Sequence, residues 1–143
     1  RAESWVKEAA DNGAEIRCGG NREGQMLDAT VLTKTSHEMK VVSEEVFAPV
    51  AVVEPFSRME EAIELANHGK YGLQAGVFTR DLQNAQLAAA ELNYGGVIIN
   101  DVPTFRVDNM PYGGVKDSGF GREGVRYAME EMTETKLIVT SNE

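Results

Sequence analysis

The sequence predicts an α/β fold built on a parallel sheet, because short β-rich segments alternate with amphipathic helical segments along most of its length. The middle of the chain follows the order strand, helix, strand, helix, strand, which favours parallel strands joined by right-handed crossovers. A near-continuous apolar segment at residues 50–54 is typical of a strand covered on both faces. With 143 residues and 42% hydrophobic content, the chain has the size of one globular domain with a sizeable core.

The first part of the chain is predicted to hold one helix and two extended segments. Apolar residues recur at helical spacing over residues 2–12, and Gly13 follows as a helix stop. Residues 15–18 form a short β-rich segment that ends at a glycine pair. Residues 26–32 form the second extended segment.

A capping box predicts where the next helix begins. Ser57 and Glu60 have the spacing at which both side chains satisfy free N–H groups of a first helical turn, so a helix is expected over residues 58–67. Three further elements are then expected, a strand at residues 75–79, a helix at 82–92 and a strand at 97–100.

A long segment without periodicity, residues 101–121, follows the last of these strands. Loops of this length in a domain are usually functional or disordered, and ligands of α/β sheets bind where strands end. The segment is therefore predicted to be a functional loop rather than a disordered one. A helix at residues 122–132 and a strand at 136–140 complete the chain.

Composition excludes several classes of function. The formal charge is −9, and the 14 basic residues are scattered, so no nucleic-acid partner is expected. No apolar run is long enough to span a bilayer, and a single cysteine suits a reducing compartment, so the protein is expected to be cytoplasmic without a membrane partner. His37 and His68 are isolated and predict no metal site. A start at Arg1, already in an amphipathic pattern, suggests a fragment or a cleaved product.

Three motifs carry a resemblance to a known family. They read E-E-V-F-A-P at residues 44–49, Y-G-L-Q-A-G-V-F-T at 71–79 and M-P-Y-G-G-V-K-D-S-G at 110–119, the last continuing through Arg122 and Glu123. In this order and spacing they resemble motifs of NAD(P)-dependent aldehyde dehydrogenases, with Ala48 where most members have Gly.

The resemblance spans about residues 44–136 and implies the parallel-sheet αβα half of an aldehyde dehydrogenase catalytic domain. It implies that residues 1–134 are the C-terminal part of that domain and that 135–143 are an oligomerisation strand and tail. A homo-oligomer formed through this strand is therefore expected.

The resemblance also implies an activity, the oxidation of a small aldehyde to the carboxylic acid with NAD or NADP. In this family a cysteine attacks the aldehyde to form a thiohemiacetal, a hydride leaves to the nicotinamide, and water releases the acid. The nucleophile belongs to a motif that this chain does not contain, so no catalytic residue is assigned and the chain alone is expected to be inactive. Cys18 lacks suitable neighbours in sequence and is predicted to be a small buried hydrophobe or an idle surface thiol.

Four residues are candidate binding residues by resemblance. Glu45 and Phe47 match positions that lie along the nicotinamide riboside; a carboxylate can accept from both ribose hydroxyls, and an aromatic ring can pack on the riboside. The alternative is that Phe47 is core and Glu45 a turn residue. Phe105 and Tyr112 match positions at the mouth of the aldehyde pocket. Asn100 is expected to play a structural hydrogen-bonding role near the active site.

Residues 119–124 read G-x-G-x-x-G, a dinucleotide fingerprint that requires a strand before it and a βαβ unit around it. A polar loop precedes it here, so the glycines are predicted to be turn and helix-entry residues.

Two other functions of the protein remain open. One is an acylating dehydrogenase that transfers the acyl group to coenzyme A, and the other is a stand-alone interaction domain without chemistry.

Overall fold

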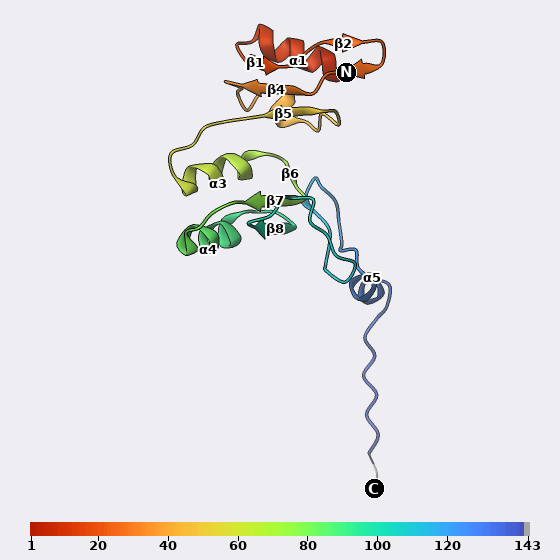
Figure 1. Ribbon diagram of the computed structural model, residues 1–143. Helices are drawn as coiled ribbons and strands as arrows, with labels where there is room; N and C mark the ends of the chain where they lie inside the picture. The colour runs from red at the N-terminus through yellow and green to blue at the C-terminus, as the bar shows by residue number, and fades with distance from the viewer. Residues whose placement is uncertain (142–143) are drawn as a thin grey trace. The chain divides into compact units, whose positions relative to one another are not determined.

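The computed structural model describes residues 1–141, which form two compact units (Figure 1). Unit 1 comprises Arg1–Gly69, and unit 2 begins at Lys70. Each unit contains one pair of adjacent parallel strands, so the predicted α/β class with parallel strands is confirmed. No helix of the described residues is long and apolar enough to cross a membrane.

Unit 1 is built on a three-stranded sheet in the order β1-β4-β5. The strand β4 (Thr30–Thr33) is parallel to β5 (Val50–Val52), with Leu32 opposite Val52, but antiparallel to β1 (Glu15–Cys18). The sheet with the parallel pair therefore also contains one antiparallel strand, β1, whose direction the sequence did not predict. The reason lies in the connection, because a short hairpin of β2 (Arg22–Glu23) and β3 (Met26–Leu27) reverses the chain, whereas a parallel pair needs a longer crossover.

Helices cover this sheet and supply the core of unit 1. Helix α1 (Ala2–Asp11) buries the apolar face predicted from its spacing, and α2 (Lys40–Ser43) follows β4. The core cluster consists of Val6, Ala9, Ala14, Leu32 and Val41. Leu32 is fully buried at the centre of the sheet, which fixes the face that β4 presents to the helices.

The helix α3 (Met59–His68) ends unit 1, and its start differs from the prediction. The N-cap is Arg58, which makes no side-chain capping bond. Ser57 therefore lies one residue too early for its hydroxyl to cap the helix, and its backbone N–H donates instead to Glu61 Oε2 at 2.8 Å. The predicted capping box of Ser57 and Glu60 is wrong by this one-residue offset.

Unit 2 contains a βαβ element and a small antiparallel ladder. The parallel pair is β7 (Gln74–Val77) and β8 (Gly96–Ile99), joined by α4 (Leu82–Glu91). Asp81 caps α4 by accepting from the N–H groups of Gln83 and Asn84 at 2.7 and 3.1 Å. The ladder pairs β6 (Tyr71–Gly72) with β9 (Val115–Lys116), so the segment expected to be irregular contains one short strand.

The last helix, α5 (Val125–Glu131), begins three residues later than residue 122, where it was expected. Glu123 is unavailable for a helical turn because its N–H and C=O both bond to the backbone of Tyr112, at 2.6 and 3.1 Å. Gly124, with φ of 111°, then turns the chain into the helix.

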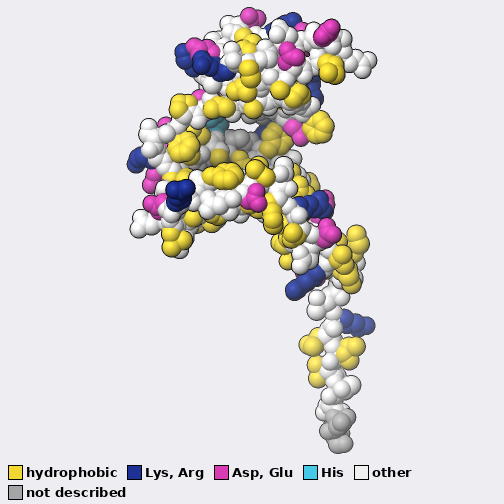
Figure 2. All heavy atoms as spheres, in the orientation of Figure 1, with side chains coloured by type: hydrophobic (Ala, Val, Ile, Leu, Met, Phe, Trp, Pro, Cys, Tyr) yellow, Lys and Arg dark blue, Asp and Glu magenta, His cyan; other side chains and the backbone are white. Residues whose placement is uncertain are grey.

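The expectation of one sizeable core is wrong for the described chain. Its buried hydrophobic residues are few and divided, with Ala88 and Leu92 in unit 2 and the others in unit 1. Large exposed hydrophobic side chains are more numerous, and Figure 2 shows them across the visible face. Within residues 1–141, the helices therefore leave much of the apolar side-chain surface uncovered.

Residues 136–140, expected as a strand, pair with no described strand. Their apolar side chains Leu137, Ile138 and Val139 are 85, 76 and 79% exposed. The final two residues of the predicted oligomerisation segment, 142 and 143, lie outside the described part of the chain.

Candidate functional site

The segment that carries Glu45 and Phe47 leaves α2 and runs toward β5 within unit 1. Phe47 has a φ of 50°, a left-handed conformation that is uncommon for an aromatic residue. Two residues apart in an extended segment, Glu45 and Phe47 would be expected to project to the same side, but the backbone turns at Phe47 and the segment is not extended there. The nearby carbonyl of Val46 accepts from Arg1 Nη2 at 2.9 Å, which ties this turn to the start of α1.

Both side chains of this segment are available for a ligand. The Phe47 ring is 85% exposed, so within this chain Phe47 is not a core residue. Glu45 is exposed, and its carboxylate pairs with no group among residues 1–141. A carboxylate with open acceptor sites and an exposed aromatic ring have the chemistry that a riboside requires, two hydroxyl donors and a flat apolar surface.

Ala48 is the position at which the sequence departs from the usual Gly. The left-handed residue of this turn is Phe47, and Ala48 is not among the residues with positive φ. The substitution therefore requires no conformation that an alanine avoids. The departure from the motif does not count against the site.

Phe105 and Tyr112 belong to unit 2 and lie in the segment between β8 and β9. Phe105 is 43% exposed, and its carbonyl accepts from Gln74 Nε2 at 3.0 Å. The same amide donates to the carbonyl of Pro103 at 2.6 Å. Gly76 allows the close approach, because a Cβ there would lie 2.7 Å from the carbonyl oxygen of Asp101. Strand β7 thus holds the beginning of this segment in place.

Tyr112 forms a cluster with two charged residues that the sequence did not predict. The guanidinium carbon of Arg106 lies 4.3 Å from the centroid of the Tyr112 ring. Arg106 Nη2 also donates to Glu123 Oε2 at 2.7 Å. The position of Arg106 between Phe105 and Tyr112 could have marked it as a candidate site residue from the sequence. Its pairing with Glu123 could not have been predicted, because it depends on the fold.

The second and third sequence motifs form one local structure. Besides the β6–β9 ladder, the N–H of Gly72 donates to Ser118 Oγ at 2.9 Å, and the N–H of Asp117 donates to the carbonyl of Lys70 at 3.0 Å. Asn100 makes a structural hydrogen bond, in which its Oδ1 accepts from the N–H of Thr79 at 2.9 Å, and its expected place near the active site stays a prediction.

The G-x-G-x-x-G segment is a turn, as predicted. Gly119, Gly121 and Gly124 all have positive φ, and the helix that follows has only seven residues. Glu131 Oε1 accepts from the N–H of Arg122 at 2.8 Å, so a carboxylate already occupies the turn. That negative charge disfavours a phosphate at this position.

Other reactive side chains lie apart from the four candidates in sequence. Cys18 is exposed, and its Sγ lies 3.9 Å from the carbonyl oxygen of Ala29. The histidines are not isolated as expected, because the rings of His37 and His68 lie 4.1 Å apart between centroids, tilted by 33°. Residues 1–141 contain no group of three His, Cys, Asp or Glu side chains suited to a metal ion.

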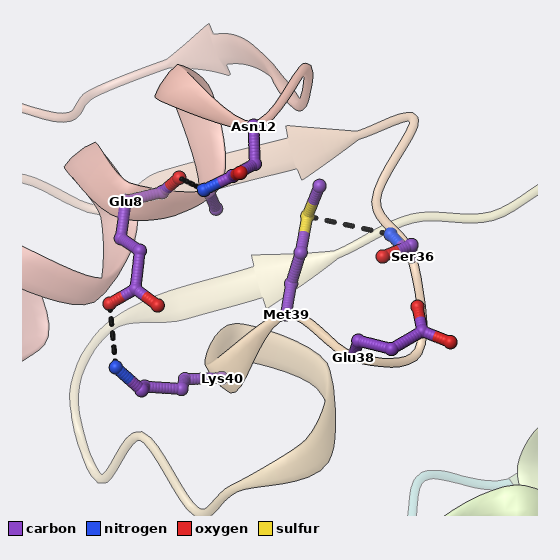
Figure 3. A pocket seen from close by; sticks show the side chains of 7 residues that line it. Glu8, Asn12, Ser36, Glu38, Met39 and Lys40 are labelled. Atoms are coloured by element: carbon purple, nitrogen blue, oxygen red, sulfur yellow. Dashed lines mark hydrogen bonds and ion pairs between the residues drawn. The ribbon is translucent and has the colours of Figure 1, made fainter.

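A pocket of about 310 Å³ lies between the end of α1 and the turn before α2 (Figure 3). Lys40 Nζ bonds to Glu8 Oε2 at 2.8 Å at its edge, and Met39 lies between Asn12 and Ser36. A hydrogen bond from the Ser36 side chain lowers the pKa of Glu38. None of the four predicted site residues lines this pocket.

Comparison with known proteins identifies the class. Residues 1–138 match the aldehyde dehydrogenase family, and the chain belongs to it. Among its relatives is a 3-sulfolactaldehyde dehydrogenase of Priestia aryabhattai, 51% identical over 97% of this chain and 29% of that protein. A lactaldehyde dehydrogenase of Methanococcus maripaludis is 46% identical over 99% of this chain and 30% of that protein.

Solved structures agree with this assignment. The crystal structure of aldehyde dehydrogenase 21 from Physcomitrella patens, in complex with the reaction product succinate, has a TM-score of 0.93 and 47% identity, covering 97% of this chain and 29% of that one. A glyceraldehyde-3-phosphate dehydrogenase from Methanocaldococcus jannaschii, complexed with NADP, has a TM-score of 0.84 and 44% identity, covering 91% and 28%. The chain therefore spans about 29% of the length of the relatives it matches.

Proposed function

We propose that the full-length protein oxidises an aldehyde to the carboxylic acid with NAD or NADP, and that this chain supplies part of the cofactor and aldehyde sites. The observation that carries the proposal is the family match over residues 1–138. The cysteine nucleophile, which would form a thiohemiacetal, is proposed to lie outside this chain, because the hydrogen bond that Cys18 Sγ makes, at 3.9 Å, is to the carbonyl oxygen of Ala29 and not to a base.

Within this proposal Glu45 and Phe47 orient the cofactor. The nicotinamide ring of bound NAD(P) accepts the hydride from the substrate. Glu45 accepts hydrogen bonds from ribose hydroxyls, and the exposed Phe47 ring packs on the riboside. These contacts fix position, while the bulk of the affinity comes from groups outside this chain.

Phe105 and Tyr112 are proposed to form part of the wall at the mouth of the aldehyde pocket. Both side chains keep some exposure, and their backbones are held by Gln74 and Glu123. The relatives are named for 3-sulfolactaldehyde, lactaldehyde and aspartate semialdehyde, and one neighbour holds succinate. Charged and neutral aldehydes are therefore both candidate substrates.

Substitution of Glu45 by Gln in the full-length protein tests the function and the role of this residue together. We expect Glu45→Gln to slow hydride transfer more than it weakens cofactor binding, with a loss of about 1 to 3 kcal/mol, as for a hydrogen bond to a charged group. Single-turnover formation of NADH or NADPH and a cofactor titration measure the two quantities.

The matched control is Glu60→Gln, which changes an exposed glutamate on α3 and should leave both quantities unaltered. If Glu45→Gln also changes neither the rate of hydride transfer nor cofactor binding, Glu45 is a turn residue.

Assays with and without coenzyme A separate the hydrolytic reaction from the acylating one. If the full-length protein reduces neither NAD nor NADP with any aldehyde, the hypothesis of an interaction domain without chemistry is favoured.

Residues 136–140 are proposed to pair with a β-strand of another subunit in a homo-oligomer. The exposed apolar side chains of this segment favour such a contact, since unpaired apolar edges associate. We expect Ile138→Pro, which removes a ladder N–H, to shift the full-length protein to smaller species in analytical ultracentrifugation. Ile138→Val should leave the distribution unchanged. An unaltered oligomer in Ile138→Pro argues against this interface.

A further inference from the structure

Gln74 has the one polar side chain of strand β7, and both of its amide hydrogens are used in hydrogen bonds. Its Nε2 donates to the carbonyl of Pro103 at 2.6 Å and to the carbonyl of Phe105 at 3.0 Å. These acceptors lie 29 and 31 positions further along the chain, at the start of the segment between β8 and β9. One side chain thus connects β7 to the segment that contains Phe105.

Neighbouring glycines make this connection possible. Gly76 lies two residues after Gln74 and therefore on the same face of β7, and a Cβ there would lie 2.9 Å from Pro103 Cδ. Gly96 is the partner of Gln74 in β8, and a Cβ there would lie 3.3 Å from Gln74 Cγ. The Gln74 side chain therefore lies against β8 at a position without a side chain, and the segment lies directly on β7.

The orientation of the Gln74 amide is fixed by the two carbonyl groups. Its Oε1 is buried and has no hydrogen-bond partner among residues 1–141. If the amide were turned by 180°, Oε1 would face both carbonyl oxygens and both hydrogen bonds would be lost. The fold therefore keeps two bonds to the segment although a buried acceptor stays unpaired, which costs free energy.

We propose that Gln74 is a positioning residue for the aldehyde site, which holds residues 103–105 in their binding conformation before the aldehyde arrives. This inference rests on the proposed function, in which Phe105 is part of the wall at the mouth of the pocket. Without the connection, the segment would have to be ordered on binding, and the entropy lost would weaken the affinity for the aldehyde. Gln74 thus acts through Phe105, and it acts on affinity rather than on hydride transfer.

The test is Gln74→Met in the full-length enzyme, which keeps the length of the side chain and removes both donors. Steady-state kinetics are measured with neutral lactaldehyde and with succinic semialdehyde, which carries a carboxylate. We expect KM for both aldehydes to rise by about 5- to 50-fold, as for the loss of two hydrogen bonds. Both kcat and KM for the cofactor should change by less than about twofold, because neither depends on how the segment is held.

Gln74→Glu separates the hydrogen bonds from simple packing. This variant has nearly the shape of the wild-type side chain, but at neutral pH it places a charged oxygen against the two carbonyl oxygens. We therefore expect a larger rise in KM for the aldehydes than in Gln74→Met, whereas a side chain that only fills space would give the smaller rise. Gln86→Glu makes the same chemical change at an exposed position of α4 and should alter neither KM nor kcat.

Amide hydrogen exchange of the full-length protein gives a readout besides activity. The N–H of Phe105, which donates to the carbonyl of Val102 at 3.1 Å, should exchange faster in Gln74→Met than in wild type. The amides of β7 and β8 should keep their protection, which also shows that the variant is folded.

A fall in kcat at unchanged KM for the aldehydes would overturn the proposal, because it would indicate a role in stability alone. An unchanged KM with unchanged kcat would overturn it as well, and so would a rise for only one of the two aldehydes, which would indicate direct contact with that substrate. In these cases wild-type turnover leaves the proposed function intact. If the wild-type protein oxidises no aldehyde, the proposed function fails, and the positioning role of Gln74 fails with it whatever the exchange rates are.

Discussion

The isolated chain is expected to form no NADH or NADPH from any aldehyde. Its one thiol, Cys18, lies in β1 with the Ala29 carbonyl oxygen 3.9 Å from Sγ. A carbonyl oxygen accepts from a thiol and gives no stabilisation to a thiolate, which is the form that attacks an aldehyde. Absorbance at 340 nm with purified chain, aldehyde and cofactor measures the activity.

The informative control uses the full-length protein with Cys18→Ala. If Cys18 has no catalytic part, this variant should turn over aldehyde at the wild-type rate. Loss of a true nucleophile lowers kcat by as much as about 10⁶-fold, so the two outcomes are easily distinguished. Activity of the isolated chain that disappears in Cys18→Ala would show that the assignment of the nucleophile to another segment is wrong.

Substitution of Gly95 by alanine is expected to destabilise the full-length protein by more than about 3 kcal/mol, or to prevent its folding. A Cβ at Gly95 would lie 1.7 Å from the carbonyl oxygen of Gly113 and 3.1 Å from Cα of Gly114. These are backbone atoms that cannot move aside alone. The start of β8 would have to separate from the third motif. Urea unfolding, or soluble yield where the variant does not fold, measures the effect.

Gly69→Ala provides the matched control for this substitution. A Cβ at Gly69 meets no atom within 4 Å, and the residue has a φ of −65°. The free energy of unfolding should change by less than about 0.5 kcal/mol. A Gly95→Ala variant as stable as Gly69→Ala would show that β8 and the Gly113–Gly114 backbone are not in contact in the full-length protein.

The elements that the sequence predicted well are those with local signals. Helix α1 and strand β1 lie within one residue of their expected bounds, because periodicity and a following glycine define them without tertiary contacts. The start of α5 was missed because the backbone bonds between Glu123 and Tyr112 compete with the helix. The antiparallel β1–β4 pair was missed because its cause, the β2–β3 hairpin, consists of strands of only two residues.

Only the part of the candidate site that lies within recognisable sequence motifs could be predicted from the sequence. They identify Glu45, Phe47, Phe105 and Tyr112 by residue type and spacing, and the roles of these residues stay predictions. The left-handed φ of Phe47 carries no local signal, since a glycine or asparagine is the usual residue there. The contact of Arg106 with Glu123 joins residues 17 positions apart and arises from the fold alone.

The ladder between β6 and β9, with Ser118 bonded to Gly72, has a consequence for recombination among related genes. A breakpoint between these two motifs gives a chimera in which each half of the ladder comes from a different parent. Residues 101–121, the segment to exchange when a new substrate is wanted, also contact Gln74 and leave no space for a side chain at Gly76. A transplant of that segment therefore has to include residues 70–76 from the same donor.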